Sequence, residues 1–486
     1  MFKSYFFNKA SAQYEDRLLL LDTINMQAKV DYMSILKKNG FDLVLYQNDL
    51  QLRLDLERCK AAEKIAIIAH SKDYIPYDIK QQFFCFELKL ESLFPRLNAE
   101  AITNFPGLNY DLLTMAYEDD FDDHYEVEQT IDFIKEKAYN RDNIKRFVDT
   151  IYTSINEDIL KAKTIKDWYA IAIQKARADV EGAKANYYGD ASLCNSKFQE
   201  FFLVKYGSLT MEMDNNGPVL VKSAMEFMHD HSKKFVIIVM DGMSLFDWQV
   251  LKTIFADFKF HEGKSCAMLP TTTSISRQCL LSNKFPIKLE EPWKQSKEKA
   301  EFINCAQDMG YDRLQIDYQR GYDVEFASQI KCGAIIINDI DDMVHAQLDG
   351  REGMLEDVTK LVKRGKLARL VKRLLHAEFD VYITADHGNT PCVGMGKLKN
   401  TGIETETKSR RMLVLKDFAD KQQYLEKYGM IELVKKNFLP RDFDYLLCAA
   451  GSSFDDKGEE VMSHGGMTID EVIVPFITFK AVENNG

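Results

Sequence analysis

The stretch KFVIIVMDGMS, residues 234–244, decides the fold. Its central run FVIIVM is continuously apolar, as in a strand that is buried on both faces, and it stops at Asp241. Ligands and catalytic groups collect where the parallel strands of an open α/β sheet end. Asp241 is therefore a candidate metal ligand or base, although a strand that ends in Asp-Gly can also lead into a plain turn.

Two later stretches repeat this construction. A second apolar run, AIII, leads to Asp341 and His345, and a third, VYIT, leads to Asp386 and His387. Asp341 and His345 are four residues apart, so on a helical turn both side chains lie on one face and can hold one cation. Asp386 and His387 are adjacent and point apart, so this pair can serve two neighbouring metal ions, one each.

A further histidine, His464, stands in the stretch SHGGM ahead of a last apolar run at 472–476. Carboxylate oxygens combined with imidazole nitrogens suit zinc or manganese better than calcium or an iron-sulfur cluster. The sequence therefore predicts a site for two divalent ions at one edge of a sheet. Zn²⁺ is the first choice and Mn²⁺ the alternative, and no other cofactor is expected.

Together with one more motif, these residues resemble the alkaline phosphatase superfamily and, within it, the PglZ domain. The motif is PTTTSISR, residues 270–277, which lies between Asp241 and the second apolar run. The resemblance covers about residues 230–480 and includes all seven expected positions in the expected order. It implies an α/β fold, in which an alkaline-phosphatase-like catalytic domain is built on a central, mostly parallel sheet.

The resemblance also implies a nucleophile, the hydroxyl three residues after the proline. That residue is Thr273, whereas Thr271 and Thr272 carry the same group and remain alternatives. A bound dication would lower the pKa of this hydroxyl. A helix that starts just after the threonine would direct backbone N–H groups at the substrate phosphate.

The family pattern assigns the metal ligands to two sets. The set at the nucleophile's ion is Asp241, Asp386 and His387, although adjacency alone would give Asp386 and His387 to different ions. The set at the other ion is Asp341, His345 and His464.

Positive charge near the site is predicted from two places. Arg277 lies one helical turn after Thr273, where it can contact substrate oxygens or form a structural salt bridge. Lys408, Arg410 and Arg411 form the second basic cluster.

The implied function is that of a metal-dependent phosphodiesterase or phosphohydrolase. Its expected substrates are phosphoesters, with nucleotides or nucleic acid as the favoured class, and its expected protein partners belong to phage-defence or signalling systems. The alternatives are a phosphatase or phosphomutase of the same superfamily and a non-catalytic scaffold subunit of a defence complex. A sulfatase is disfavoured, because Cys266 lies four residues before Pro270 and not in a Cys-x-Pro-x-Arg motif.

The composition is that of an ordinary globular protein with two or three domains. The chain has 486 residues, of which 46% are hydrophobic and 28% charged. A net charge of −12 speaks against general electrostatic capture of nucleic acid. We expect no membrane segment and no signal peptide, and nine scattered cysteines without a C-x-x-C pair favour a reduced, cytoplasmic protein.

Changes in pattern along the chain predict three parts. Residues 1–100 are expected to form a small α/β unit, and residues 101–220 a helical connecting domain. The turn-rich stretch 214–218 marks the next boundary. Residues 221–486 then form the catalytic domain, with a cap insertion around 392–460.

Four segments carry finer predictions. Apolar spacing predicts a helix over 77–94, and the threonine motif is expected to precede a helix over 275–282. Residues 283–330 show no strong strand and resemble an insertion. A basic amphipathic helix is predicted at about 355–376, either as a solvated face packed on the sheet or as a groove for a phosphate backbone.

Overall fold

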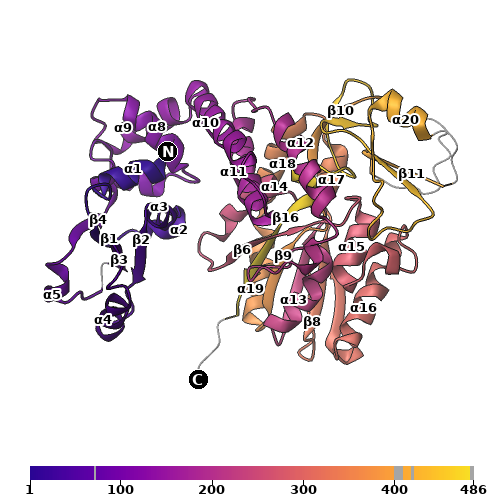
Figure 1. Ribbon diagram of the computed structural model, residues 1–486, viewed down its shortest axis with the longest axis horizontal. Coiled ribbons are helices and arrows are strands. Elements are labelled where there is room, and N and C mark those ends of the chain that lie inside the picture. The colour runs from indigo at the N-terminus through magenta and orange to yellow at the C-terminus, as the bar shows by residue number, and fades with distance from the viewer. Residues whose placement is uncertain (71–72, 399–408, 417–420, 482–486) are drawn as a thin grey trace. The chain divides into compact units, whose positions relative to one another are not determined.

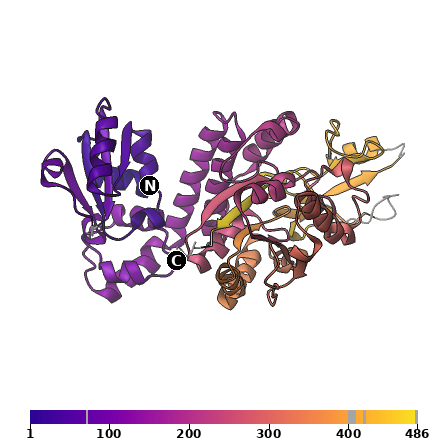
Figure 2. The same ribbon diagram turned by 90° about the horizontal axis from the view of Figure 1, so that it is seen from below.

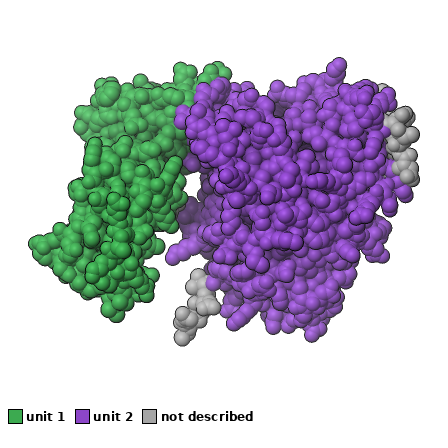
Figure 3. Space-filling model, viewed as in Figure 1, with its two compact units in different colours: residues 1–147 green, residues 148–486 purple. Residues whose placement is uncertain are grey.

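The computed structural model describes residues 1–70, 73–398, 409–416 and 421–481. The chain divides into two compact units, residues 1–147 and residues 148–486 (Figure 3). Among the described residues, no helix is long and apolar enough to cross a membrane.

The first unit is built on a four-stranded parallel sheet with the strand order β2-β3-β1-β4. Its strands are β1 (Arg17–Asp22), β2 (Phe41–Leu45), β3 (Lys64–His70) and β4 (Phe84–Leu88). Its helices are α1 (Phe2–Lys9), α2 (Met26–Lys29), α3 (Met33–Lys38), α4 (Asp49–Arg58), α5 (Tyr77–Lys80), α6 (Leu90–Leu93), α7 (Ala99–Asn104), α8 (Tyr110–Asp119), α9 (Val127–Phe133) and the first part of α10 (Arg141–Ile159), with a π-helical turn at Ile134–Ala138.

The prediction of one helix over residues 77–94 is wrong for the middle of that segment. Residues 84–88 form β4, which pairs in parallel with β1 from Leu18 opposite Phe84 to Asp22 opposite Leu88. The aromatic-rich sequence FCFEL suits a strand, and the edge of β1 supplies the hydrogen bonds that fix it as one. Only the flanking segments α5 and α6 are helical.

The second unit is built on a six-stranded sheet with the order β6-β16-β9-β5-β8-β7. β5 pairs in parallel with β8 and β9, and β7 pairs in parallel with β8, whereas β16 is antiparallel to both of its neighbours. The predicted α/β class with a mostly parallel sheet is confirmed. The strands are β5 (Phe235–Met240), β6 (His261–Cys266), β7 (Ile316–Arg320), β8 (Cys332–Ile337), β9 (Asp380–Thr384) and β16 (Ile473–Phe479).

This topology gathers distant segments at one edge. The parallel strands β5, β8 and β9 all end at the same edge of the sheet. β16 runs in the opposite direction, so the residues that precede it reach that edge as well. Every residue of β5 and β8 is buried, which explains their unbroken apolar sequences.

The helices of the second unit include the one predicted after the threonine motif. The predicted helix at 275–282 is observed as part of α15. The helices are α11 (Ile165–Ala183), α12 (Ser192–Lys205), α13 (Ala224–His231), α14 (Leu245–Leu251), α15 (Thr273–Ser282), α16 (Glu298–Asp308), α17 (Asp339–Ala346), α18 (Gly350–Arg364), α19 (Lys366–His376), α20 (Lys421–Tyr428) and α21 (Ile469–Val472).

Two predictions about this unit need correction. The single basic helix at 355–376 is two helices, α18 and α19, because Gly365 between them adopts a left-handed φ of +61°. Segment 283–330 was expected to lack a strong strand, but it contains β7, an edge strand of the sheet. In β7 polar and apolar residues alternate, so a search for continuous apolar runs does not detect it. α19 packs with Leu367, Leu370, Val371 and Leu374 buried, which fits a solvated helix face on the sheet.

The second unit also contains two small sheets, which include β10 and β11, drawn in orange and yellow (Figures 1 and 2). Their orders are β14-β10-β15 and β11-β13-β12. Their strands lie wholly or partly within the predicted cap, 392–460, of which 399–408 and 417–420 lie outside the described residues. The strands are β10 (Thr390–Gly394), β11 (Met412–Leu415), β12 (Ile431–Glu432), β13 (Asp444–Leu447), β14 (Ser452–Ser453) and β15 (Glu460–Ser463).

The predicted connecting domain at 101–220 is helical, but its helices belong to two different cores. Ile102, Leu113 and Phe133 pack in the core of the first unit. Trp168 and Phe198 pack in the core that contains the central sheet of the second. The three-part division stays a prediction, and the compact units meet at 147–148 within α10.

Candidate metal centre

One potential metal site consists of Asp341, His345 and His464, whose ligand atoms all lie within 4.8 Å of one another. Helix α17 places Asp341 and His345 one turn apart, with Nε2 of His345 3.4 Å from Oδ2 of Asp341. His464 comes from the segment between β15 and α21, and its Nε2 lies 3.4 Å from Oδ1 of Asp341. This is the set of three that the family pattern predicts for one ion.

The protonation of His464 shows that this site fits a cation. Its Nδ1 lies 3.1 Å from the carbonyl oxygen of Thr271, which can only accept, so Nδ1 carries the proton. Burial, reinforced by His387, lowers the pKa of His464 to about 3, and the ring is therefore neutral. Its Nε2 lone pair thus faces the oxygen lone pairs of Asp341, and neither atom has a hydrogen-bond partner among the residues described. A metal ion between them would satisfy both.

A second potential site consists of Asp241, Asp341 and His387. The Nε2 of His387 lies 4.0 Å from Oδ1 of Asp241 and 3.8 Å from Oδ2 of Asp386. The expected third ligand, Asp386, therefore lies beside this group, while Asp341 contributes to both groups. A carboxylate shared by two ligand sets is an arrangement suited to a pair of neighbouring ions.

Asp386 is oriented by backbone donors. Its Oδ1 accepts from the N–H of Gly242 at 3.2 Å and from the N–H of His387 at 3.1 Å. Its Oδ2 has no hydrogen-bond partner in the described parts of the chain, and the same holds for Oδ1 of Asp241. Both carboxylates thus have one oxygen held by the protein and one available to a cation.

The electrostatics of the three carboxylates also favour bound positive charge. Burial, together with the charge of Asp386, raises the pKa of Asp241 well above its usual range, and Arg277 only partly opposes this. Burial raises the pKa of Asp386 to about 6. The pKa of Asp341 is lowered, because its hydrogen bond to His345 and its proximity to His464 outweigh the effect of burial. Divalent ions would stabilise the ionised form of all three.

Thr273 is the threonine whose hydroxyl lies at this cluster. It is the first residue of α15, and its Oγ1 lies 3.0 Å from Nε2 of His387. The neighbouring hydroxyls bond elsewhere: Thr271 donates to the carbonyl oxygen of Gly466 at 2.8 Å, and Thr272 accepts from Ser409 at 2.7 Å. The geometry therefore favours Thr273 among the three candidates.

Arg277 is fully buried and makes the structural salt bridge that was one of its two alternatives. Its guanidinium pairs with Asp241, and its Nε donates to Oε2 of Glu298 at 2.6 Å. Glu298 also accepts from Tyr318 and Arg320. Arg277 thus orients a candidate ligand. Sequence reasoning missed Glu298, because an acid inside a segment without motifs gives no signal.

The predicted basic cluster of the cap does not supply free positive charge in the described structure. Lys408 lies outside the described residues. Arg410 pairs with Asp455, and Arg411 is fully buried, with its Nε 3.0 Å from Oε1 of Glu471. The intervening Ser409 was also missed, and its Oγ contacts Thr272 and lies 3.5 Å from Nδ1 of His464.

Comparison with known proteins gives one family match. A family model described as the BREX system PglZ alkaline phosphatase-like domain matches residues 220–479. No curated protein sequence matches the chain.

Several solved structures resemble part of the chain at low similarity. Murine ectonucleotide pyrophosphatase/phosphodiesterase 5 is 13% identical, covers 51% of this chain and 88% of its own, and has a TM-score of 0.33. The human protein of the same name is 16% identical, with coverages of 51% and 87% and a TM-score of 0.34. Phosphonoacetate hydrolase from Sinorhizobium meliloti 1021 is 12% identical, with coverages of 52% and 92% and a TM-score of 0.34. Values this low establish no shared activity.

Proposed function

The chain belongs to the PglZ family of alkaline phosphatase-like domains, and on this premise we propose that it hydrolyses phosphoesters with a threonine nucleophile and two divalent metal ions. The observation that carries the proposal is the position of the Thr273 hydroxyl, 3.0 Å from His387, at the edge of two overlapping ligand groups. A scaffold without catalysis would not need a hydroxyl there.

The residues present fit the two ions. Asp341, His345 and His464 would hold one of them, and Asp241, His387 and the adjacent Asp386 would hold the other, with Asp341 close to both. When bound, such ions lower the pKa of a neighbouring hydroxyl and neutralise charge on phosphoryl oxygens. Zn²⁺ is the proposed ion and Mn²⁺ the alternative, because the donors are carboxylate oxygens and imidazole nitrogens.

The chain's own groups would then perform a two-step transfer. The Thr273 oxygen forms a bond to phosphorus as the bond to the leaving ester oxygen breaks, and the proton lost from the hydroxyl leaves with that oxygen in the alcohol product. The N-terminus of α15 would stabilise the phosphoryl oxygens, because Thr273 is its first residue and the positive end of the helix dipole lies there. Water then breaks the threonine–phosphorus bond and restores the hydroxyl.

We further propose that the substrates are phosphodiesters of the nucleotide or oligonucleotide class and that the protein acts in phage defence, since the matched family is described as part of the BREX system. A cytoplasmic location is also proposed, and the free thiols of all nine cysteines support it.

The test is the hydrolysis of two chromogenic substrates by metal-loaded protein. Bis-para-nitrophenyl phosphate is the diester, and para-nitrophenyl phosphate is the monoester. We expect the diester to be cleaved faster, and Thr273→Ala to abolish that activity. A monoester rate about tenfold higher would indicate a phosphatase or phosphomutase, and no turnover of either substrate would favour the scaffold alternative.

A further inference from the structure

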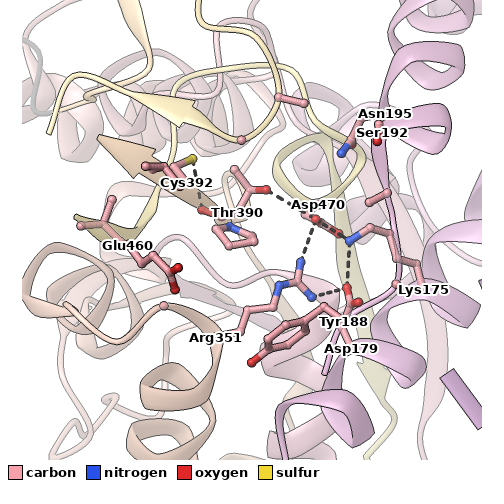
Figure 4. A pocket seen from close by; sticks show the side chains of 18 of the residues that line it. Lys175, Asp179, Tyr188, Ser192, Asn195, Arg351, Thr390, Cys392, Glu460 and Asp470 are labelled. Carbon is pink, nitrogen blue, oxygen red and sulfur yellow. Dashed lines mark hydrogen bonds and ion pairs between the residues drawn. The ribbon is translucent and has the colours of Figure 1, made fainter. Parts of the chain in front are cut away.

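A separate pocket of about 630 Å³ lies in the second unit, lined by residues of α11, α12, α18, β10 and β15 (Figure 4). None of the candidate metal ligands lines it, and neither does Thr273. Its volume is typical of small-molecule sites. The pocket is therefore a binding-site candidate distinct from the metal centre.

The two basic residues in this pocket are already neutralised. Nζ of Lys175 lies 2.8 Å from Asp179 and 2.7 Å from Asp470, and Arg351 forms ion pairs with the same two carboxylates. Figure 4 shows these four side chains joined by their contacts. The side chains of Lys175 and Arg351 are only 2% and 6% exposed. An anionic ligand would have to displace buried partners, which is costly.

Three further carboxylates line the pocket and remain uncompensated. Asp349, Glu352 and Glu460 are exposed, and their carboxylates have no hydrogen-bond or ion-pair partner among the described residues. Five carboxylates therefore face two cations, an excess of three negative charges. Glu460 lies across the pocket from Lys175 (Figure 4). The pocket is thus electrostatically suited to a cation.

An aromatic ring stands beside these acids. Tyr188 lines the pocket and is 37% exposed. Burial raises its pKa to about 12, and although Arg351 opposes this, the charges of Glu352 and Glu460 add to the effect. Tyr188, Glu352 and Glu460 all line this one pocket. An aromatic face attracts ammonium and guanidinium groups.

A buried amide supplies a further contact. Asn195 is 7% exposed, and its Oδ1 accepts from the backbone N–H of Ile469 at 3.2 Å. Its NH₂ group has no acceptor among the residues described, and the side chain lies at the pocket wall (Figure 4). A donor at a pocket wall that makes no hydrogen bond within the described protein is available to an acceptor atom of a ligand.

We propose that this pocket binds a small organic cation that carries at least one ammonium or guanidinium group. The carboxylates of Glu352 and Glu460 neutralise the positive charge of the ligand, and the ring of Tyr188 contacts its cationic group. The amide of Asn195 donates a hydrogen bond to an uncharged acceptor atom of the ligand. This inference goes beyond the proposed hydrolase function, because the pocket would bind its ligand whether or not the metal centre is catalytic.

The test uses the metal-loaded 486-residue protein and titration calorimetry with N1-acetylspermidine as the probe, since this molecule has two ammonium groups and an amide oxygen that can accept from Asn195. We expect saturable binding that Glu352→Gln and Glu460→Gln each weaken about fivefold, the effect of losing one partly exposed ion pair. Tyr188→Leu should weaken it about threefold. Glu356→Gln is the matched control, because Glu356 is an exposed acid on the same helix, α18, that does not line the pocket. It should leave the affinity unchanged.

Four outcomes would overturn the proposal. The first is the absence of saturable N1-acetylspermidine binding. The second is an equal loss of affinity in Glu356→Gln, which would mean non-specific attraction to an acidic protein. The third is binding of adenosine monophosphate that Glu460→Gln strengthens, which would assign the pocket to an anion. The fourth is tighter binding of a peptide with one lysine than of N1-acetylspermidine, which would assign the pocket to a protein side chain and not to a small molecule.

Discussion

The hydroxyl oxygen of Thr273 lies 3.0 Å from Nε2 of His387. The Nδ1 of His387 lies 3.0 Å from the carbonyl oxygen of Gly388, so Nδ1 carries the proton and Nε2 is left as the acceptor. The Thr273 hydroxyl therefore donates toward a candidate metal ligand. A cation bound at Nε2 would replace that hydrogen bond and would have the threonine oxygen as its neighbour.

Thr273→Ala should abolish phosphodiester hydrolysis, because it removes the proposed nucleophile. We expect a loss of several orders of magnitude in kcat with unchanged metal content. Thr273→Ser retains a hydroxyl and should keep measurable activity. Mass spectrometry of protein quenched during turnover should locate a phosphoryl group on Thr273.

Thr272→Ala is the control for this prediction, because its hydroxyl bonds to Ser409 and not to a ligand. It should retain most of the activity. Thr271→Ala serves less well, since it deletes a buried hydrogen bond to Gly466 and should cost about 1 kcal/mol of stability. Phosphorylation at either of these residues would contradict the assignment of Thr273.

Asp341→Ala should remove more metal than a change at one histidine does, because Asp341 belongs to both ligand groups. We expect about two ions per chain in the wild type, about one in His345→Ala, and fewer than one in Asp341→Ala, measured by elemental analysis after dialysis. Asp342→Ala, an exposed acid on the same helix, should keep both ions. Equal metal content in all three variants would refute the shared site.

Metal affinity should rise with pH through about 6. Burial raises the pKa of Asp386 to about 6, so below that pH the metal-free carboxyl is protonated and a cation must displace the proton. A raised pKa also means that the proton stabilises the metal-free fold at acid pH, and that this contribution is lost as the pH rises through 6.

Calorimetry at pH 5.5 and 7.0 should therefore show about fourfold tighter metal binding at the higher pH and proton release at the lower. Repeating the titrations in buffers of different ionisation enthalpy measures the released protons. Asp342→Asn should preserve this pH step, whereas Asp386→Asn should reduce it, with the raised pKa of Asp241 accounting for the remainder. An affinity that does not change between the two pH values would contradict the prediction.

Glu298→Ala should destabilise the second unit by about 3 kcal/mol, because it leaves the buried guanidinium of Arg277 with Asp241 as its remaining partner. Urea unfolding followed by circular dichroism measures the change. Glu290→Ala is the matched control, since the Glu290 side chain is 80% exposed and lies 3.9 Å from Lys297. It should alter stability by less than about 0.5 kcal/mol. A loss of stability of similar size in both variants would contradict the view that the burial of the Arg277–Glu298 ion pair makes its disruption costly.

The strands that deliver the site could be predicted because each is a fully buried apolar run. β5 was expected at the residues it occupies, and β8 and β9 each begin only one or two residues before their predicted starts. The ligand segments follow these runs directly, so their meeting at one edge follows from parallel pairing. The strand β4 escaped prediction, because its identity depends on the neighbouring strand β1 and not on its own periodicity.

The finer geometry of the site depends on contacts between segments far apart in the sequence. The position of Asp341 between two ligand groups follows from how α17 and the segment before α21 pack, which no spacing reveals. The pairing of Arg277 with Glu298 joins α15 to α16, and the pattern of either helix alone gives no sign of it.

The pairing of β10 with β15 fixes the relative positions of two histidines of the metal centre. Thr390 stands opposite Ser463, so the strand that leaves His387 and the strand that arrives at His464 are fixed to each other within four residues of both histidines. A slip of one residue would turn every side chain of β15 to the other face, and a slip of two would shift the strand by about 7 Å. Both displacements exceed the few tenths of an ångström that metal–ligand bonds allow. An insertion or deletion of a single residue in β15 should therefore abolish metal binding at this centre, even where the rest of the chain still folds.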